Sequence, residues 1–290
     1  MLQILRCTQE DKREWTLINF STMNSNQPIG IFDSGIGGLT IASAIHKLLP
    51  KEQLIYFGDT AHLPYGDKSP EAIKFYSLKI GKLLLDQNCK LIIIACNTAS
   101  SHAYHELVHF LGDQITILNV IDPVVNYLAA NDNFKNIGVI GTRSTIKSDV
   151  YARKLKILAP EKKVSSLATP LLAPMIEEGF YNNTISHTVI QSYLSSPELN
   201  SIDSLILACT HYPLIKKEID EFFKGKVSII SSAEIVAEHV KKTLQTSNLL
   251  HEGIPEDHQF YVSDYTSSFE NSTRMFFGEL IHLKLKNIWD

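Results

Sequence analysis

The stretches LIIIACNT (residues 91–98) and LILACTH (residues 205–211) decide the fold of this chain. Each is a continuous apolar run that ends in a cysteine, and polar residues follow the cysteine. Continuous apolar runs of this length are typical of parallel strands that helices cover on both faces. The two stretches therefore predict an α/β protein with two thiols, Cys96 and Cys209, at the carboxyl ends of two strands.

The same plan occurs twice along the chain. Ile29–Phe32 is an apolar run followed by a polar loop and a helical pattern, and the cysteine run ending at Cys96 comes later. Ile137–Ile140 has the same relation to Cys209. Ligands of open α/β sheets bind at the carboxyl ends of the strands. We therefore expect two similar open α/β domains, with mainly parallel sheets, that face each other and place both thiols in one cleft.

Further apolar runs and periodic segments alternate along the chain, as in an α/β protein. Ala99, Ala103, Leu107 and Phe110 recur at helical spacing and predict one apolar helix face. The predicted strands are Ile29–Phe32, Leu54–Phe57, Leu91–Ala95, Thr116–Val120, Ile137–Ile140, Val164–Ala168, Leu205–Ala208, Val227–Ile230 and Phe260–Val262.

Length and composition limit the classes of protein. A chain of 290 residues with 44% apolar residues favours two globular domains. The net charge of −4 and the lack of a dense basic run argue against a nucleic-acid partner. No apolar run approaches the roughly 18 residues of a membrane span, and residues 1–27 do not have the order of a signal peptide. We therefore expect a cytoplasmic protein without membrane association, with residues 1–27 as an N-terminal extension and Met23 as an alternative start.

The four cysteines are too few for a disulfide framework, so each thiol needs its own explanation. No CxxC pair occurs, which excludes zinc sites of that type. Cys89, at the edge of a strand, is expected to be structural, and Cys7, in the extension, to have no role. Cys96 and Cys209 are either buried structural cysteines or reactive thiols, and their matched positions favour reactive thiols.

The residues next to the two thiols fit acid–base chemistry. Asn97 and Thr98 are good helix N-cap residues, and a thiol at a helix N-terminus is favoured as thiolate. Thr210 and His211 follow Cys209, and an imidazole there can hold or donate a proton.

Three loops offer weaker signals. The loop Asp33–Gly38 is rich in glycine, but it lacks the Lys-Ser/Thr of a P-loop and the third glycine of GxGxxG. It suits a small anion at a helix start, and Asp33 could hold an ammonium group. The polar loop Gly58–Gly66 and Glu177 prove little when taken alone.

Together these segments resemble the glutamate racemase family, within the aspartate/glutamate racemase superfamily. The two cysteine motifs carry most of the resemblance, and the extension lies outside it. The matching segments are Ile29–Thr40, Tyr56–Thr60, Pro64–Gly66, Ala95–Ser100, Gly138–Thr142 and Ala208–Leu214.

The resemblance implies two α/β domains related by a pseudo-twofold axis, with the active site between them. The first domain would comprise residues 28–121 with 232–290, and the second residues 122–231. It implies a racemase of glutamate that uses neither cofactor nor metal and that supplies D-glutamate for peptidoglycan. It is also compatible with a homodimer.

The resemblance also assigns roles to residues of this chain. Cys96 would take the Cα proton of D-glutamate and Cys209 that of L-glutamate. The residues that would assist the thiols are Asp33, Glu177 and His211, with Asp59 as a weaker candidate. The residues that would hold the substrate are Asp33, Ser34, Tyr65, Gly66, Asn97, Thr98, Thr210 and His211.

Three other readings compete with this one. The nearest is a racemase of aspartate or of another amino acid, although His211 resembles the glutamate branch. A binding module without catalysis does not need both thiols. A thiol redox protein lacks a resolving cysteine nearby in the sequence.

Overall fold

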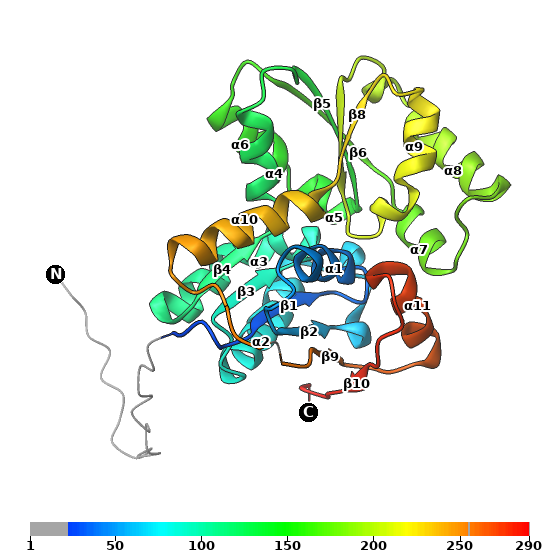
Figure 1. Cartoon of the computed structure of the whole chain (residues 1–290). Coiled ribbons are helices and arrows are strands. Elements are labelled where there is room, and N and C mark those ends of the chain that lie inside the picture. Colours follow the sequence, from blue (N-terminus) through cyan, green and yellow to red (C-terminus); the bar gives the residue numbers. More distant parts are fainter. Residues whose placement is uncertain (1–22, 255, 290) are drawn as a thin grey trace, which may run out of the picture.

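The computed structural model describes residues 23–254 and 256–289, and it consists of two α/β lobes (Figure 1). Each lobe has its own sheet, and every strand pairing within the two sheets is parallel. The predicted fold class is confirmed. Cys7 and residues 1–22 of the predicted extension lie outside the described residues.

The first sheet has the strand order β10-β9-β2-β1-β3-β4. All nine strands expected from the sequence are present in the two sheets, and each end lies within one residue of its predicted position. The strand β10 was not predicted. The strands of the first sheet are β1 (Ile29–Asp33), β2 (Leu54–Gly58), β3 (Leu91–Ile94), β4 (Thr116–Asn119), β9 (Gln259–Val262) and β10 (Lys284–Leu285).

The second sheet has the order β6-β5-β7-β8, which matches the order β2-β1-β3-β4 of the first. Its strands are β5 (Asn136–Gly141), β6 (Lys163–Ala168), β7 (Ser204–Ala208) and β8 (Ser228–Ile230). In this correspondence β1 matches β5 and β3 matches β7. The repeat expected from the sequence is therefore present as a repeat of sheet topology, and Cys96 and Cys209 follow equivalent strands.

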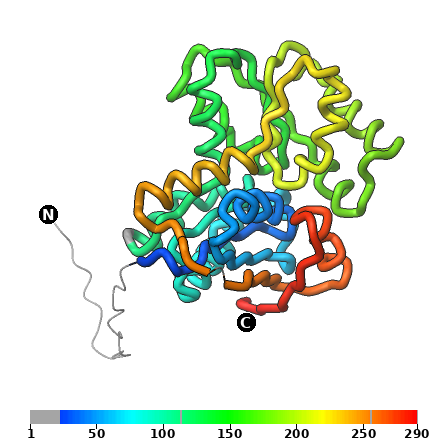
Figure 2. Tube along the Cα trace, viewed as in Figure 1, coloured from blue at the N-terminus to red at the C-terminus, as the bar shows by residue number. Residues whose placement is uncertain are grey.

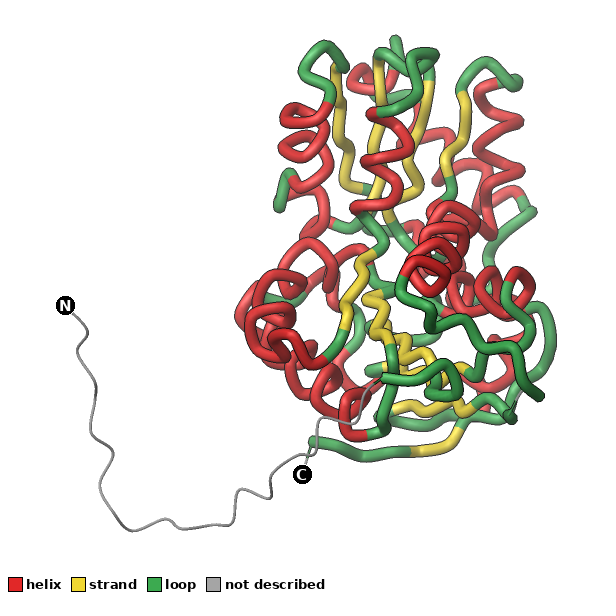
Figure 3. Tube along the Cα trace, turned by 60° about the vertical axis from the view of Figure 1, so that its left-hand side comes forward, coloured by secondary structure: helices red, strands yellow, loops and turns green. Residues whose placement is uncertain are grey.

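Helices cover both faces of each sheet (Figure 3). They are α1 (Leu39–Leu48), α2 (Pro70–Asp86), α3 (Asn97–Leu111), α4 (Asp122–Ala129), α5 (Arg143–Lys147), α6 (Val150–Leu158), α7 (Leu172–Glu177), α8 (Thr184–Leu194), α9 (Lys216–Phe223), α10 (Ser232–Thr246) and α11 (Ser267–Phe277). Ala99, Ala103 and Leu107 of α3 are buried as predicted, but Phe110 is 52% exposed. The prediction for Phe110 was wrong because its place on the helix lies just past the edge of the buried stripe.

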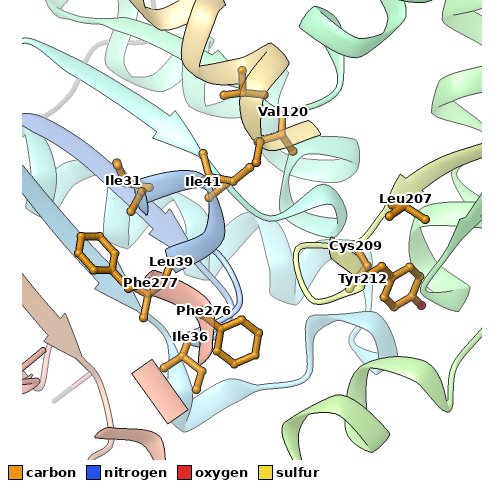
Figure 4. Close-up of a cluster of buried hydrophobic side chains, with 14 of the residues drawn as sticks. Ile31, Ile36, Leu39, Ile41, Val120, Leu207, Cys209, Tyr212, Phe276 and Phe277 are labelled. Atoms are coloured by element: carbon orange, nitrogen blue, oxygen red, sulfur yellow. The ribbon is translucent and has the colours of Figure 1, made fainter. Parts of the chain in front are cut away.

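Three clusters of buried side chains stabilise the lobes. One joins α2 and α3 to a face of the first sheet, and another joins α4 and α6 to a face of the second. The largest extends across both lobes: Figure 4 shows Ile36, Leu39 and Phe276 on one side and Cys209 and Tyr212 on the other. Because burial of apolar surface stabilises by about 25 cal/mol per Å², this shared core holds the ends of the two sheets together.

The chain passes from the first sheet to the second after β4 and returns through α10, which crosses between the lobes (Figure 2). The boundaries of the two domains, 28–121 with 232–290 and 122–231, stay a prediction. No helix within the described residues is long and apolar enough to span a membrane.

Candidate active site

A cavity of about 240 Å³ lies where the carboxyl ends of β1, β3 and β7 meet. This volume is below the roughly 300–1,000 Å³ of sites for drug-sized ligands, so it suits a small metabolite. Ten of the predicted site residues line it: Ser34, Tyr65, Gly66, Cys96, Asn97, Thr98, Glu177, Cys209, Thr210 and His211. Both thiols therefore border one space, whereas Asp33 and Asp59 lie behind its wall.

Cys96 itself is the N-cap of α3. Its Sγ accepts a hydrogen bond from the backbone N–H of Ala99 at 3.4 Å. The sequence suggested Asn97 or Thr98 as the N-cap, but the thiol has this role. The Ser34 Oγ lies 3.8 Å from this sulfur. Burial, and after it the negative charge of Asp33, raises the pKa of the Cys96 thiol despite these two contacts. The surroundings of Cys96 thus favour the protonated thiol.

Cys209 has a different partner. The Nδ1 of His211 lies 3.6 Å from the Cys209 Sγ, and the Nε2 of His211 lies 2.8 Å from the Glu177 Oε1. Burial disfavours the imidazolium, but the contacts with Cys209 and Glu177 outweigh it and raise the pKa of His211 well above its ordinary value. An imidazolium that donates to both neighbours is the partner that a thiolate needs. The two thiols therefore have different neighbours: Cys96 is buried near the Asp33 carboxylate, whereas Cys209 lies beside the His211 imidazole.

Asp33 acts from behind the cavity wall. Its carboxylate accepts a hydrogen bond from the backbone N–H of Gly38 at 2.5 Å and one from the Thr210 hydroxyl at 3.4 Å. The expected anion site at the start of α1 is therefore partly occupied by this side chain. Gly37 is needed for close approach, because a Cβ there would lie 2.4 Å from the His211 Cε1.

Asn97 lines the cavity and has one buried donor without a partner in the described part of the chain. Its Oδ1 accepts a hydrogen bond from the Tyr151 hydroxyl at 2.6 Å, which fixes the orientation of the amide. Its Nδ2 is buried and has no hydrogen-bond partner among the described residues. A buried donor without a partner costs about 1–3 kcal/mol, so a carboxylate in the cavity would satisfy it. Tyr151 belongs to α6 of the other lobe, and sequence reasoning missed it because nothing local marks it.

Hydroxyl groups join the lobes beside Asn97. The Thr98 Oγ1 lies 2.9 Å from the Thr142 Oγ1 and 3.0 Å from the Thr145 Oγ1. Thr142 also lines the cavity, and it was not predicted as a site residue. Its position in the loop after β5, which corresponds to the Asp33–Ser34 loop after β1, is the signal that could have found it.

Tyr65 and Gly66 both line the cavity. The Tyr65 hydroxyl donates to the Asp59 Oδ2 at 2.7 Å. Gly66 leaves room for the opposite lobe, since a Cβ there would lie 2.9 Å from the Thr142 Cβ. Cys89, by contrast, is buried away from the cavity, and burial raises the pKa of its thiol to about 12. This agrees with its predicted structural role.

Comparison with known proteins identifies the family of this chain. Residues 38–240 match the family described as Asp/Glu/Hydantoin racemase. The chain belongs to this racemase family. A glutamate racemase of Geobacter metallireducens is 42% identical over 251 residues, which cover 86% of this chain and 92% of the relative.

Solved structures agree with this assignment. A glutamate racemase of Francisella tularensis in complex with D-glutamate superposes with a TM-score of 0.86 at 38% identity, covering 91% of this racemase and 99% of that chain. The isoform RacE1 of Bacillus anthracis gives a TM-score of 0.84 at 33% identity, with 91% and 98% covered. The expected family and its isomerase class are confirmed.

Proposed function

We propose that this racemase interconverts L-glutamate and D-glutamate by a two-base mechanism in which Cys96 and Cys209 act on opposite faces of Cα. The observation that carries the proposal is that these two thiols, at the ends of equivalent strands in two sheets, border one cavity. Inversion at carbon needs a base on one face and an acid on the other, and a thiol can be either. The names of the relatives support glutamate as the substrate.

The reaction from L-glutamate to D-glutamate would start with Cys209 as thiolate and Cys96 as thiol. The Cys209 thiolate, paired with the His211 imidazolium, takes the Cα proton as the C–H electron pair remains on carbon. The Cys96 thiol then gives its proton to the opposite face, so that Cys209 ends as thiol and Cys96 as thiolate. The reverse reaction uses the same groups in exchanged roles, and no cofactor takes part.

The acidity of the Cα proton is the main obstacle, because each pKa unit between carbon and thiol costs about 1.4 kcal/mol. Donors aimed at the α-carboxylate lower this barrier, most effectively in a site closed to water. Asn97 offers its unpartnered Nδ2, and Thr98 and Thr210 offer hydroxyl groups at the cavity wall. No lysine or arginine of the described residues lines the cavity, so the carboxylates are held by neutral donors and by His211.

In a bacterial cytoplasm the product D-glutamate would supply peptidoglycan synthesis. We propose this role because the relatives are glutamate racemases. We also propose that Asp33 and Glu177 assist the two thiols. A homodimer is part of the same proposal, and sedimentation of the purified protein tests it.

The test is exchange at Cα in deuterated water. Purified protein with L-glutamate and no added cofactor is expected to lose optical rotation while deuterium enters Cα. The variants C96A and C209A should each lose racemisation by at least about 10³-fold, because one face then lacks its acid or base. The variant C89A, which removes a buried thiol away from the cavity, should stay active.

Two results would overturn the proposal. Wild-type protein without exchange would exclude glutamate racemisation, and an active C96A or C209A variant would exclude the two-base assignment. L-Aspartate, offered in the same assay, distinguishes the nearest alternative, since faster exchange with aspartate would assign that substrate.

A further inference from the structure

The carboxylate of Asp59 joins three distant parts of the chain behind the cavity. It is fully buried at the end of β2. Its Oδ1 accepts hydrogen bonds from the Ser263 hydroxyl at 2.7 Å and from the Trp289 indole Nε1–H at 3.1 Å. Its Oδ2 accepts one from the Tyr65 hydroxyl at 2.7 Å, and the His62 Nδ1 lies 3.0 Å from both oxygens.

Trp289 reaches this carboxylate through a segment that is held along the first sheet. The strand β10 pairs with β9, and the Lys286 N–H donates to the Val262 carbonyl at 2.9 Å. Figure 2 shows this red segment beside the orange β9 at the base of the first lobe. The path of the backbone therefore brings the indole to Asp59, behind the residues that line the cavity.

The indole ring of Trp289 packs against other aromatic side chains. Its centroid lies 4.5 Å from that of His62 in edge-on geometry and 5.3 Å from that of Tyr76. His62 in turn stacks on Tyr76 at 4.1 Å, and the Lys79 ammonium lies 5.1 Å above the indole. Aromatic pairs of this geometry attract each other beyond the burial of their surfaces, so the ring holds His62 as well as Asp59.

The other end of this network is the cavity wall. Tyr65 and Gly66 line the cavity, and the Tyr65 hydroxyl is bound only to Asp59 in the described residues. Burial, followed by the charge of Asp59, raises the pKa of Tyr65 well above its ordinary value, so the phenol remains a donor. The position of this wall thus depends on where the Asp59 carboxylate is held.

We propose that Trp289 is a positioning residue of the active site, which fixes Asp59 and through it the Tyr65–Gly66 wall that faces the substrate. This inference rests on the proposed function, because its main readout is glutamate racemisation. Loss of the indole N–H leaves the carboxylate with one donor fewer and lets the wall relax. The effect falls on substrate binding and not on the proton transfers.

The test is the variant W289F, which keeps an aromatic ring and removes the N–H donor. We expect KM for glutamate to rise about 3- to 10-fold with kcat within about twofold, as for loss of one hydrogen bond that acts on binding. The control is F75L, which changes a ring that is 60% exposed, lies 6.4 Å from the indole between centroids and has no hydrogen-bond donor for Asp59. Its KM should equal that of the wild type.

A second readout uses the fluorescence of Trp289 in the variant W15F, where it is the only tryptophan. D-Glutamate should shift its emission, because the ligand and the indole touch the two ends of one network. An unchanged KM in folded W289F, or an unchanged emission of W15F at saturating D-glutamate, would overturn the positioning role. If W289F does not fold, the emission of W15F alone decides. Inactive wild-type protein would instead overturn the proposed function, and the inference with it.

Discussion

Cys209 and Glu177 both raise the pKa of His211, and the substitution E177Q tests the share of Glu177. The Glu177 Oε1 lies 2.8 Å from the His211 Nε2, and the side chains are 30% and 8% exposed. Glutamine keeps the size and an acceptor oxygen and removes only the negative charge. Because that charge raises the pKa of His211, the imidazolium of the variant should lose its proton at lower pH.

The magnitude follows from the type of contact. Hydrogen bonds to charged groups contribute about 1.5–3 kcal/mol, and the partial exposure of Glu177 favours the lower part, about 1.5–2 kcal/mol. Loss of this contribution makes the imidazolium less favourable by that free energy and so lowers the pKa of His211. Activity that needs the imidazolium is complete below its pKa and lost above it, so the alkaline limb moves to lower pH, and each ~1.36 kcal/mol corresponds to a tenfold change. Above the limb of the variant, kcat/KM should fall by up to about 10- to 30-fold.

The assay is kcat/KM against pH for both enantiomers. The equilibrium constant between enantiomers is 1, so the variant must lose kcat/KM equally in the two directions at each pH. The control is E178Q, which makes the same chemical change at the next residue, an exposed one outside the cavity lining. An active E177Q enzyme whose alkaline limb coincides with that of the wild type would refute the coupling between Glu177 and His211.

Two further substitutions test single contacts. Y151F should raise KM about 2- to 10-fold, because loss of the hydrogen bond to Asn97 lets the amide turn. The control is Y127F, at an exposed tyrosine. Equal KM values for the two variants would contradict the orienting role of Tyr151. K90M should lower the free energy of unfolding by about 3–5 kcal/mol in urea titrations, since it leaves the buried Glu52 without its cation. The double variant with E52Q should recover part of that loss, and no recovery would exclude the ion pair as its source.

The local pattern of the sequence was enough for the strands and for the repeat. Residues 91–94 and 204–208 are buried throughout because parallel strands between two helix layers need apolar side chains on both faces. The same pattern places Cys96 and Cys209 at strand ends, whatever the rest of the chain does. The missed strand, β10, has two exposed residues and therefore no apolar pattern to reveal it.

The tertiary structure decided which side chains meet. Tyr151 contacts Asn97 across 54 positions, and Trp289 contacts Asp59 across 230, so no spacing in the sequence marks either pair. It also gave the two thiols different surroundings, with Asp33 near Cys96 and His211 beside Cys209. The sequence determined two strands that end in cysteine, because burial acts locally along a strand. Only the packing of the lobes brought these cysteines to one cavity, because that depends on contacts between distant segments.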